Sequence, residues 1–207
     1  MQTLQEDCGV RYNPDSIYNP DFSDSRDSFL HGLMDPKRGG TCASMPVLYV
    51  AVGRRLGYPI KLVQTRGHLF CRWDDPNGER FNIEGTNGFS SYRDEFYRKW
   101  PYGLTEDQLA SREYLVSLTP AEELAVFMAS RGHCYMDLQR FPEAVAAYKE
   151  MARLAPTFKV QSEFVPMAQL AADKGLAEYE RVYGKMPELM DPPPPPPEFA
   201  NTPLGGP

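Results

Sequence analysis

The sequence predicts an α+β domain in which one central helix packs on an antiparallel sheet, followed by a helical extension. Three observations support this fold class. Residues 42–56 place apolar side chains almost all round a helix, three alternating segments follow within residues 60–84, and helical periodicity returns after residue 119. A chain of 207 residues, 42% of them hydrophobic, can bury a core for such a domain.

The central helix is expected over residues 42–56. Its apolar side chains stand at positions 45, 47, 48, 50, 51, 52 and 56, a distribution typical of a buried helix. Pro46 falls in the first turn, where the missing N–H removes no helical hydrogen bond. Gly57 and Pro59 are expected to end the helix.

Three strands are expected after this helix, over residues 60–63, 68–73 and 79–84. The segment Asp74-Asp75-Pro76-Asn77-Gly78 has the composition of a hairpin turn and joins the last two strands. The three strands therefore form an antiparallel meander, which places the end of the third strand beside the start of the second.

Residues 85–118 begin with a loop over residues 85–88 and carry an aromatic cluster. The cluster consists of Tyr92, Phe96, Tyr97, Trp100 and Tyr102, interleaved with Arg93, Arg98 and Lys99. Aromatic residues alternating with bases can stack on nucleobases. The acidic chain and the irregular spacing favour core packing or a pocket wall instead.

Helices and a proline-rich tail are expected beyond residue 119. Thr119-Pro120-Ala121-Glu122 combines a cap, a first-turn proline and a glutamate at the third position, and Pro142 begins a second helix. A third helix is expected from Val165 to Tyr183. Six consecutive prolines at residues 192–197 predict an extended, polyproline-like tail from residue 186.

The first 38 residues are polar and rich in turns. One short helix is expected over residues 25–33, where Phe29, Leu30 and Leu33 share a face. His31 lies in this helix without a partner residue nearby, and we interpret it as a surface or packed imidazole.

Composition limits the class of protein. The net charge of −6 argues against a general nucleic-acid binder, and no apolar run approaches the length of a membrane span. The cysteines at positions 8, 42, 71 and 134 form no CxxC pair and no metal-ligand spacing. The N-terminus has no basic and apolar regions typical of a signal peptide. We therefore expect a soluble cytoplasmic protein with free thiols and no cofactor.

One cysteine stands where a thiolate is favoured. Cys42 follows Gly39 and Gly40 and precedes the central helix, whose dipole and free N–H groups stabilise negative charge. A nucleophilic cysteine needs a base, and the base needs an orienting acceptor. His68 opens the second strand after Gly67, so we expect it at an edge of the sheet, facing the start of the helix.

The third strand supplies two candidates for the orienting acceptor. Asn82 and Glu84 share a face, since strand residues two apart point the same way. Glu84 is preferred because a carboxylate stabilises an imidazolium, and Asn82 remains an alternative third member or a supporting group. Two other hypotheses stay open: Cys42 as a small buried hydrophobic residue, and zinc bound by Cys42, His68 and Glu84.

These residues resemble the transglutaminase-like superfamily of the papain-like fold. The resemblance runs through Gly40-Thr41-Cys42-Ala43-Ser44, Arg54-Arg55-Leu56-Gly57-Tyr58-Pro59, Gly67-His68-Leu69-Phe70 and Phe81-Asn82-Ile83-Glu84-Gly85-Thr86. The family's third catalytic residue is usually Asp, followed by Pro-Thr or Pro-Phe. Glu84-Gly85-Thr86 stands at that place here, which lengthens the side chain by one methylene.

The resemblance is closest to bacterial proteins in which this domain precedes tetratricopeptide repeats. Gly132, Tyr135, Ala144, Tyr148 and Pro156 match one such repeat over residues 127–156. We therefore expect a catalytic domain over residues 1–118, a tetratricopeptide-like region over 119–185 and the tail over 186–207.

The resemblance implies acyl chemistry on a protein or peptide. In this interpretation Cys42 attacks a carboxamide or peptide carbonyl, His68 moves the proton, Glu84 orients His68, and the backbone N–H of Cys42 donates to the oxyanion. No glutamine lies between Gln5 and Cys42 to act as the upstream oxyanion donor of papain-like enzymes. The alternative is a non-catalytic module that binds peptides on the same scaffold and a protein partner through its repeat helices.

Overall fold

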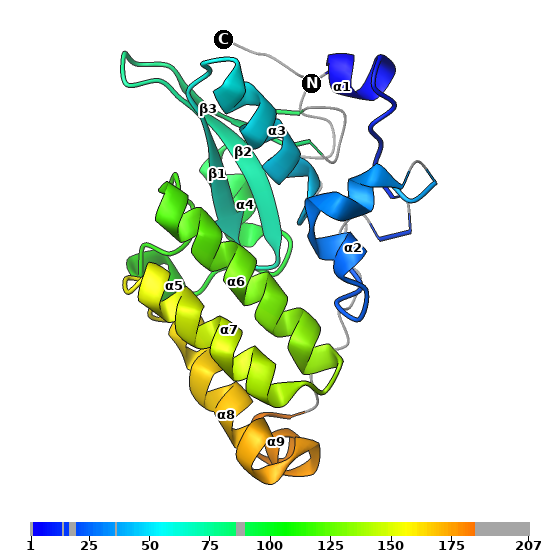
Figure 1. Cartoon of the computed structure of the whole chain (residues 1–207). Helices are drawn as coiled ribbons and strands as arrows, with labels where there is room; N and C mark the ends of the chain where they lie inside the picture. Colours follow the sequence, from blue (N-terminus) through cyan, green and yellow to red (C-terminus); the bar gives the residue numbers. More distant parts are fainter. Residues whose placement is uncertain (1, 14, 17–19, 36, 86–89, 185–207) are drawn as a thin grey trace.

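The computed structural model describes residues 2–13, 15–16, 20–35, 37–85 and 90–184 (Figure 1). The turn residues expected at 14, 19 and 36, most of the loop expected over 85–88 and the proline-rich tail from residue 186 lie outside these ranges. The elements in chain order are α1 (Gln2–Glu6), α2 (Ser25–Ser28), η1 (Leu30–Met34), α3 (Met45–Arg55), β1 (Ile60–Thr65), β2 (His68–Asp74), β3 (Arg80–Ile83), α4 (Asp94–Lys99), α5 (Glu106–Ala110), α6 (Pro120–Asp137), α7 (Phe141–Leu154), η2 (Gln161–Glu163), α8 (Phe164–Lys174) and α9 (Leu176–Tyr183).

The three expected strands form one antiparallel sheet in the order β1-β2-β3. Its hairpin turn is closed by the backbone bond from the Asp75 N–H to the Glu79 carbonyl, which confirms the predicted turn. β2 is the central strand, and its pairing with β3 covers only Cys71 to Asp74, so His68 lies at the end of the sheet, as expected. His68 is the first residue of this central strand and pairs with Thr65 of β1.

The central helix is present but begins later than expected. α3 starts at Met45, and Cys42 lies in the turn before it. The Thr41 carbonyl accepts the N–H groups of Ser44 and Met45, at 3.2 and 3.0 Å, and this turn precedes the regular helical ladder. Cys42 is therefore held by a loop that leads into the helix and is not itself a helical residue.

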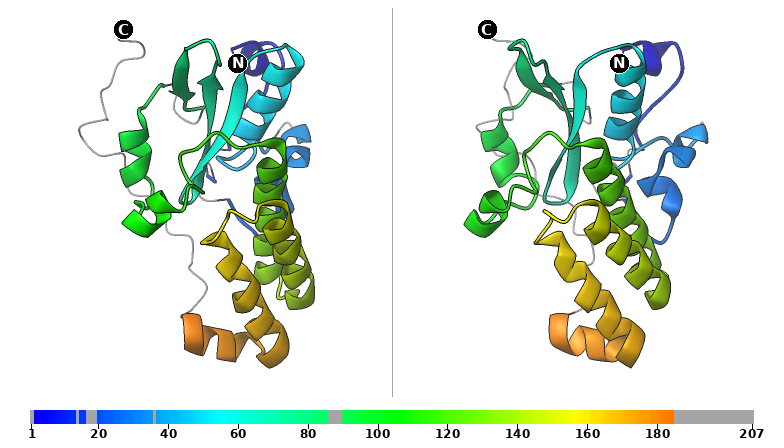
Figure 2. Two further views of the ribbon diagram at one scale, coloured as in Figure 1. Left: turned by 90° about the vertical axis from the view of Figure 1, so that its left-hand side faces the viewer. Right: turned by 60° about the vertical axis from the view of Figure 1, so that its left-hand side comes forward.

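The sheet separates two clusters of buried side chains. On one face, residues of α3, β1, β2, α6 and α7 share the larger core, which includes Met45, Leu62 and Val126. On the other face, Phe70 packs with the aromatic side chains of α4. Figure 2 shows the sheet between α3 and α4. The aromatic cluster is thus a packed core, as expected, and Tyr97 is fully buried within it.

Helices α6 to α9 follow one another away from the sheet (Figure 1). α6 and α7 form an antiparallel pair whose Ala125, Ala129 and Met151 belong to the same core as α3. The single helix expected from Val165 to Tyr183 is instead two helices separated at Gly175. The short helix expected over residues 25–33 is likewise divided, because Phe29 adopts an extended backbone (φ −132°, ψ 159°) between α2 and η1.

No helix in the described ranges is both long enough and apolar enough to cross a membrane.

A half-buried histidine makes the helical pair sensitive to acid. His133 in α6 bonds through Nδ1 to the Tyr148 hydroxyl of α7, at 2.8 Å, and its ring contacts Phe22 and Phe164. Burial lowers the pKa of His133 to about 4. The unfolded chain therefore takes up this proton first, near pH 6.5, and unfolding becomes easier as the pH falls from 6.5 to 4.

Between pH 6.5 and 4 this effect should lower the free energy of unfolding of the wild-type protein by up to about 3 kcal/mol. We expect His133→Gln to escape this loss, because glutamine does not take up a proton. Urea unfolding of both proteins at pH 7, 5.5 and 4 measures this difference. His31→Gln is the matched control, since His31 is exposed. Parallel losses of stability in wild type and His133→Gln would contradict the expectation.

Candidate functional site

Gly39 and Gly40, which precede Cys42, allow the chain to pass close to the backbone of residues 11–13. The Gly40 N–H donates to the Arg11 carbonyl and the Gly40 carbonyl accepts the Asn13 N–H, both at 2.8 Å. Gly39 has φ +84°, and a Cβ there would lie 2.7 Å from the Arg11 carbonyl oxygen. The glycine pair therefore fixes the approach of the chain to the cysteine.

Thr41 and Ser44 hold the cysteine loop on both sides of Cys42. The Thr41 hydroxyl donates to the Asp27 carbonyl, at 2.6 Å, and accepts the Ala43 N–H, at 3.1 Å. The Ser44 hydroxyl accepts the Thr41 N–H, at 3.0 Å. Arg38 in turn binds the buried Asp27 carboxylate, at 2.6 Å. The loop is thereby anchored to α2.

His68 and Glu84 are diagonal neighbours on the sheet. The register pairs Cys71 with Ile83, so Glu84 stands opposite Phe70 and diagonally from His68, on the same face. His68 Nε2 lies 2.7 Å from Glu84 Oε2, and both side chains are buried, with 3% and 1% of their residue surface exposed. The longer side chain of glutamate suits this diagonal separation.

The thiol of Cys42 also interacts with the His68 ring. Burial disfavours the charged imidazolium, but the charge of Glu84 and hydrogen bonds with Cys42 and Glu84 outweigh it and raise the pKa of His68 to about 10. Since Nε2 faces Glu84, Nδ1 is the ring nitrogen left for the thiol. The structure thus brings Cys42, His68 and Glu84 together in that order.

Asn82 lies elsewhere. Its Oδ1 accepts the Arg72 guanidinium, at 2.7 Å, and its Nδ2 donates to the Tyr92 carbonyl and the Asp94 carboxylate, at 2.9 and 2.8 Å. These bonds tie β2 and β3 to the start of α4. The structure does not bring Asn82 to His68.

Tyr97 and Trp100, which the sequence analysis assigned to core packing or a pocket wall, complete the surroundings of His68. The Tyr97 hydroxyl donates to Glu84 Oε2, at 3.1 Å, the same oxygen that faces His68. The Trp100 ring meets the His68 ring edge-on, with centroids 4.9 Å apart. The sequence could have suggested that a buried tyrosine hydroxyl bonds to some partner, because such hydroxyls are rarely left unpaired. It could not have identified Glu84 as that partner.

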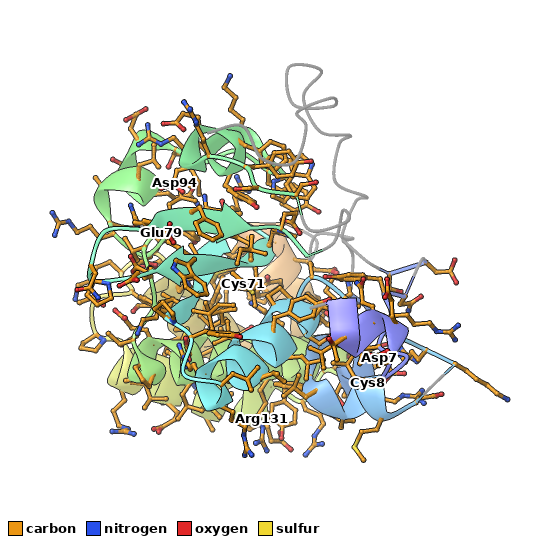
Figure 3. All side chains as sticks on the ribbon, turned by 90° about the horizontal axis from the view of Figure 1, so that it is seen from above. Asp7, Cys8, Cys71, Glu79, Asp94 and Arg131 are labelled. Atoms are coloured by element: carbon orange, nitrogen blue, oxygen red, sulfur yellow. The ribbon has the colours of Figure 1, made fainter. Side chains whose placement is uncertain are left out.

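The other cysteines have different surroundings. Cys71 is buried between α3 and the sheet and Cys8 lies on the surface near α1 (Figure 3). Burial raises the pKa of the Cys71 thiol, which donates to the Pro46 carbonyl, at 3.4 Å. Among the described residues no group of three or more His, Cys, Asp and Glu side chains is placed to hold a metal ion.

The Tyr97 hydroxyl allows a direct test of this arrangement. Tyr97→Phe keeps the ring stacked on Phe70, with centroids 3.8 Å apart, but removes one donor from the buried Glu84 carboxylate. We expect the free energy of unfolding in urea to fall by about 1–3 kcal/mol. Tyr183→Phe, at an exposed tyrosine of α9, is the control. A Tyr97→Phe protein as stable as wild type would show that Glu84 does not depend on this donor.

Comparison with known proteins places the chain in a family. No significant match is found among curated proteins or among solved structures. A family model described as the transglutaminase-like superfamily matches residues 3–127, which is more than half of the chain and contains Cys42, His68 and Glu84. The chain belongs to the transglutaminase-like superfamily.

Proposed function

We propose that this protein is a cysteine enzyme that performs acyl chemistry on a protein or peptide. The observation that carries the proposal is the buried His68 ring between the Cys42 thiol and the Glu84 carboxylate. A ring that keeps its proton at neutral pH is the counter-charge that a thiolate requires. Membership of the family agrees with this chemistry, and the papain-like fold is its usual scaffold.

The proposed reaction has two halves. The Cys42 thiolate attacks a carboxamide or peptide carbonyl, and the imidazolium of His68 gives its proton to the departing amine as the C–N bond breaks, leaving a thioester. Water or a second amine then attacks the thioester, His68 takes a proton from it, and Cys42 leaves as thiolate. Glu84 orients the ring and stabilises its charge throughout.

The backbone N–H of Cys42 is the proposed oxyanion donor. The turn before α3 uses the N–H groups of Thr41, Ala43 and Ser44. Within the part of the chain that the structure describes, the Cys42 N–H donates no hydrogen bond. A donor that is already in place beside the nucleophile can stabilise the developing oxyanion.

The helices after α5 are proposed as a tetratricopeptide-like partner surface, as in the bacterial branch that the sequence resembles. In support, α6 and α7 pack antiparallel, and a Cβ at Gly132 would lie 2.2 Å from the Tyr148 ring. A small residue facing an aromatic one suits the close helix pairs of such repeats.

A non-catalytic peptide-binding module is the second candidate. The observation that favours it is burial, since only 3% of the surface of Cys42 is exposed. In this case the loop and the sheet would serve as a scaffold, and no covalent intermediate would form.

Trapping an acyl adduct distinguishes the two candidates. The protein is incubated with a primary amine and with peptides that contain glutamine or hydrophobic residues, and its tryptic peptides are examined by mass spectrometry. The enzyme predicts an acyl adduct on the Cys42 peptide that is absent from Cys42→Ala. Reversible peptide binding without any adduct, or equal adducts on Cys42 and Cys71, would favour the non-catalytic module.

A further inference from the structure

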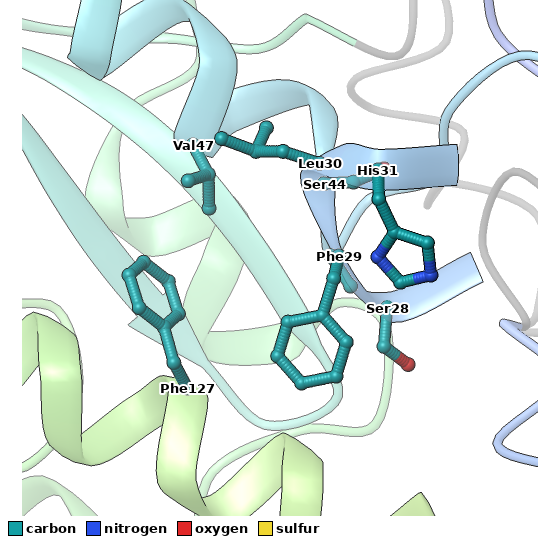
Figure 4. A pocket seen from close by; sticks show the side chains of 8 residues that line it. Ser28, Phe29, Leu30, His31, Ser44, Val47 and Phe127 are labelled. Carbon is teal, nitrogen blue, oxygen red and sulfur yellow. The ribbon is translucent and has the colours of Figure 1, made fainter. Parts of the chain in front are cut away.

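An apolar cavity lies beside the cysteine loop. It has a volume of about 300 Å³ and opens between α2, η1, the start of α3 and α6 (Figure 4). Cavities of this size lie at the lower end of the range that holds small ligands. The lining residues are Ser28, Phe29, Leu30, His31, Ala43, Ser44, Val47 and Phe127.

The cavity adjoins the proposed nucleophile through the backbone. Ala43 and Ser44, which line it, are the two residues that follow Cys42. Consecutive Cα atoms are about 3.8 Å apart, so the wall of the cavity begins one residue from the nucleophile. The cavity is therefore close enough to Cys42 to receive a side chain of a peptide that binds there.

The polar groups of the lining are already engaged. The Ser44 hydroxyl accepts the Thr41 N–H, His31 Nε2 lies 3.3 Å from the Ser25 hydroxyl, and Ser28 accepts the Cys134 thiol at 3.8 Å. The remaining walls are hydrocarbon. In Figure 4 Phe29 and Phe127 extend into the space between α2 and α6 while Val47 enters from α3. A charged side chain would lose its hydration against walls that are mostly hydrocarbon.

We propose that this cavity is the specificity pocket of the enzyme and that it takes a bulky apolar side chain, aromatic or branched aliphatic, next to the acyl carbonyl of the substrate. The substrate class is thus a peptide with a hydrophobic residue at the reacting carbonyl. This inference rests on the proposed function, because the pocket is assigned by its position beside Cys42.

Binding to the Cys42→Ala protein tests the pocket without any turnover. Cys42 does not line the cavity, so this variant keeps its walls. N-acetylphenylalaninamide and N-acetylglycinamide are titrated against the full chain and followed by NMR. We expect the phenylalanine compound to bind about 10-fold or more tightly. Equal affinities for the two compounds would overturn the proposal.

Two variants locate the binding. Leu30 lines the cavity and is 38% exposed, so adding Leu30→Glu to the Cys42→Ala protein places a charge in the pocket with little effect on folding. We expect this variant to lose most of the preference for the phenylalanine compound. Phe81→Ala removes an exposed aromatic side chain of β3 and should leave the preference unchanged. A preference that survives Leu30→Glu would also overturn the proposal.

The experiments distinguish a wrong assignment of the pocket from a wrong assignment of the acyl chemistry. The rate of Cys42 alkylation by iodoacetamide, which needs no apolar pocket, reports on the nucleophile alone. Fast alkylation of Cys42 with no preference in binding rejects the pocket and leaves the acyl chemistry in place. A clear binding preference with an inert Cys42 rejects the enzyme, and the cavity then stands as a site for apolar side chains on the non-catalytic module.

Discussion

Glu84→Gln should lower the pKa of His68 from about 10 to 6.5 or below, because the side chain keeps its size but loses the charge that, together with the hydrogen bonds of the ring, outweighs burial. At neutral pH the His68 ring would then be mostly neutral and would no longer stabilise a thiolate on Cys42. We expect acylation of Cys42 to slow by about 100-fold or more at pH 7. A ¹⁵N NMR titration of the His68 ring and the rate of adduct formation measure the two effects.

The same substitution changes the response of stability to alkali. In wild type the folded pKa of His68 is raised above its unfolded value, so its contribution to stability is complete below pH 6.5 and is lost as the pH rises through about 10. Glu84→Gln should abolish this alkaline loss. Glu79→Gln, at an exposed glutamate in the hairpin turn, is the control. An unchanged His68 titration in Glu84→Gln would show that the carboxylate does not set the charge of the ring.

Arg72→Met should cause the largest loss of stability, about 3–5 kcal/mol in the free energy of unfolding. The Arg72 side chain is fully buried, and it donates to Asn82, to the Leu115 carbonyl and to Asp94. Methionine fills part of the volume but removes the donor from the Asn82 Oδ1 and the Leu115 carbonyl in the interior, while Asp94 keeps its bond with Asn82 Nδ2. Urea unfolding measures the loss.

Arg80→Met provides the matched control for this substitution. Arg80 lies on the same hairpin but is exposed, and its pair with Asp74 has a separation of 3.5 Å. We expect it to change the free energy of unfolding by no more than about 0.5 kcal/mol. Equal losses in the two variants would mean that the buried network contributes no more than a surface ion pair.

Apolar periodicity in the sequence predicted the helix and strands that position Cys42, His68 and Glu84. The apolar residues of α3 and the alternation of the three strands are short-range signals, and the structure has these elements in the expected order. The juxtaposition of His68 and Glu84 followed from pairing the ends of consecutive strands. The preference for Glu84 over Asn82 rested on charge alone, because two residues on one strand face cannot be separated by pattern.

The features that the sequence did not reveal depend on contacts between distant residues. The late start of α3 reflects the bond from Thr41 to Asp27, fourteen residues earlier. The partner of Asn82 is a buried arginine on the adjacent strand, and Tyr97 reaches Glu84 from a helix beyond the sheet.

Competitive alkylation tests the central claim most directly. Cys8 is exposed and Cys42 is 3% exposed, so accessibility alone favours Cys8. The folded protein is treated with limiting iodoacetamide at pH 7, and the two cysteine peptides are quantified by mass spectrometry over time. An activated Cys42 paired with His68 predicts faster alkylation at Cys42 than at Cys8, and a rate at Cys42 that falls in Glu84→Gln. Alkylation of Cys8 alone, with Cys42 modified only after unfolding in urea, would contradict the assignment of Cys42 as the nucleophile.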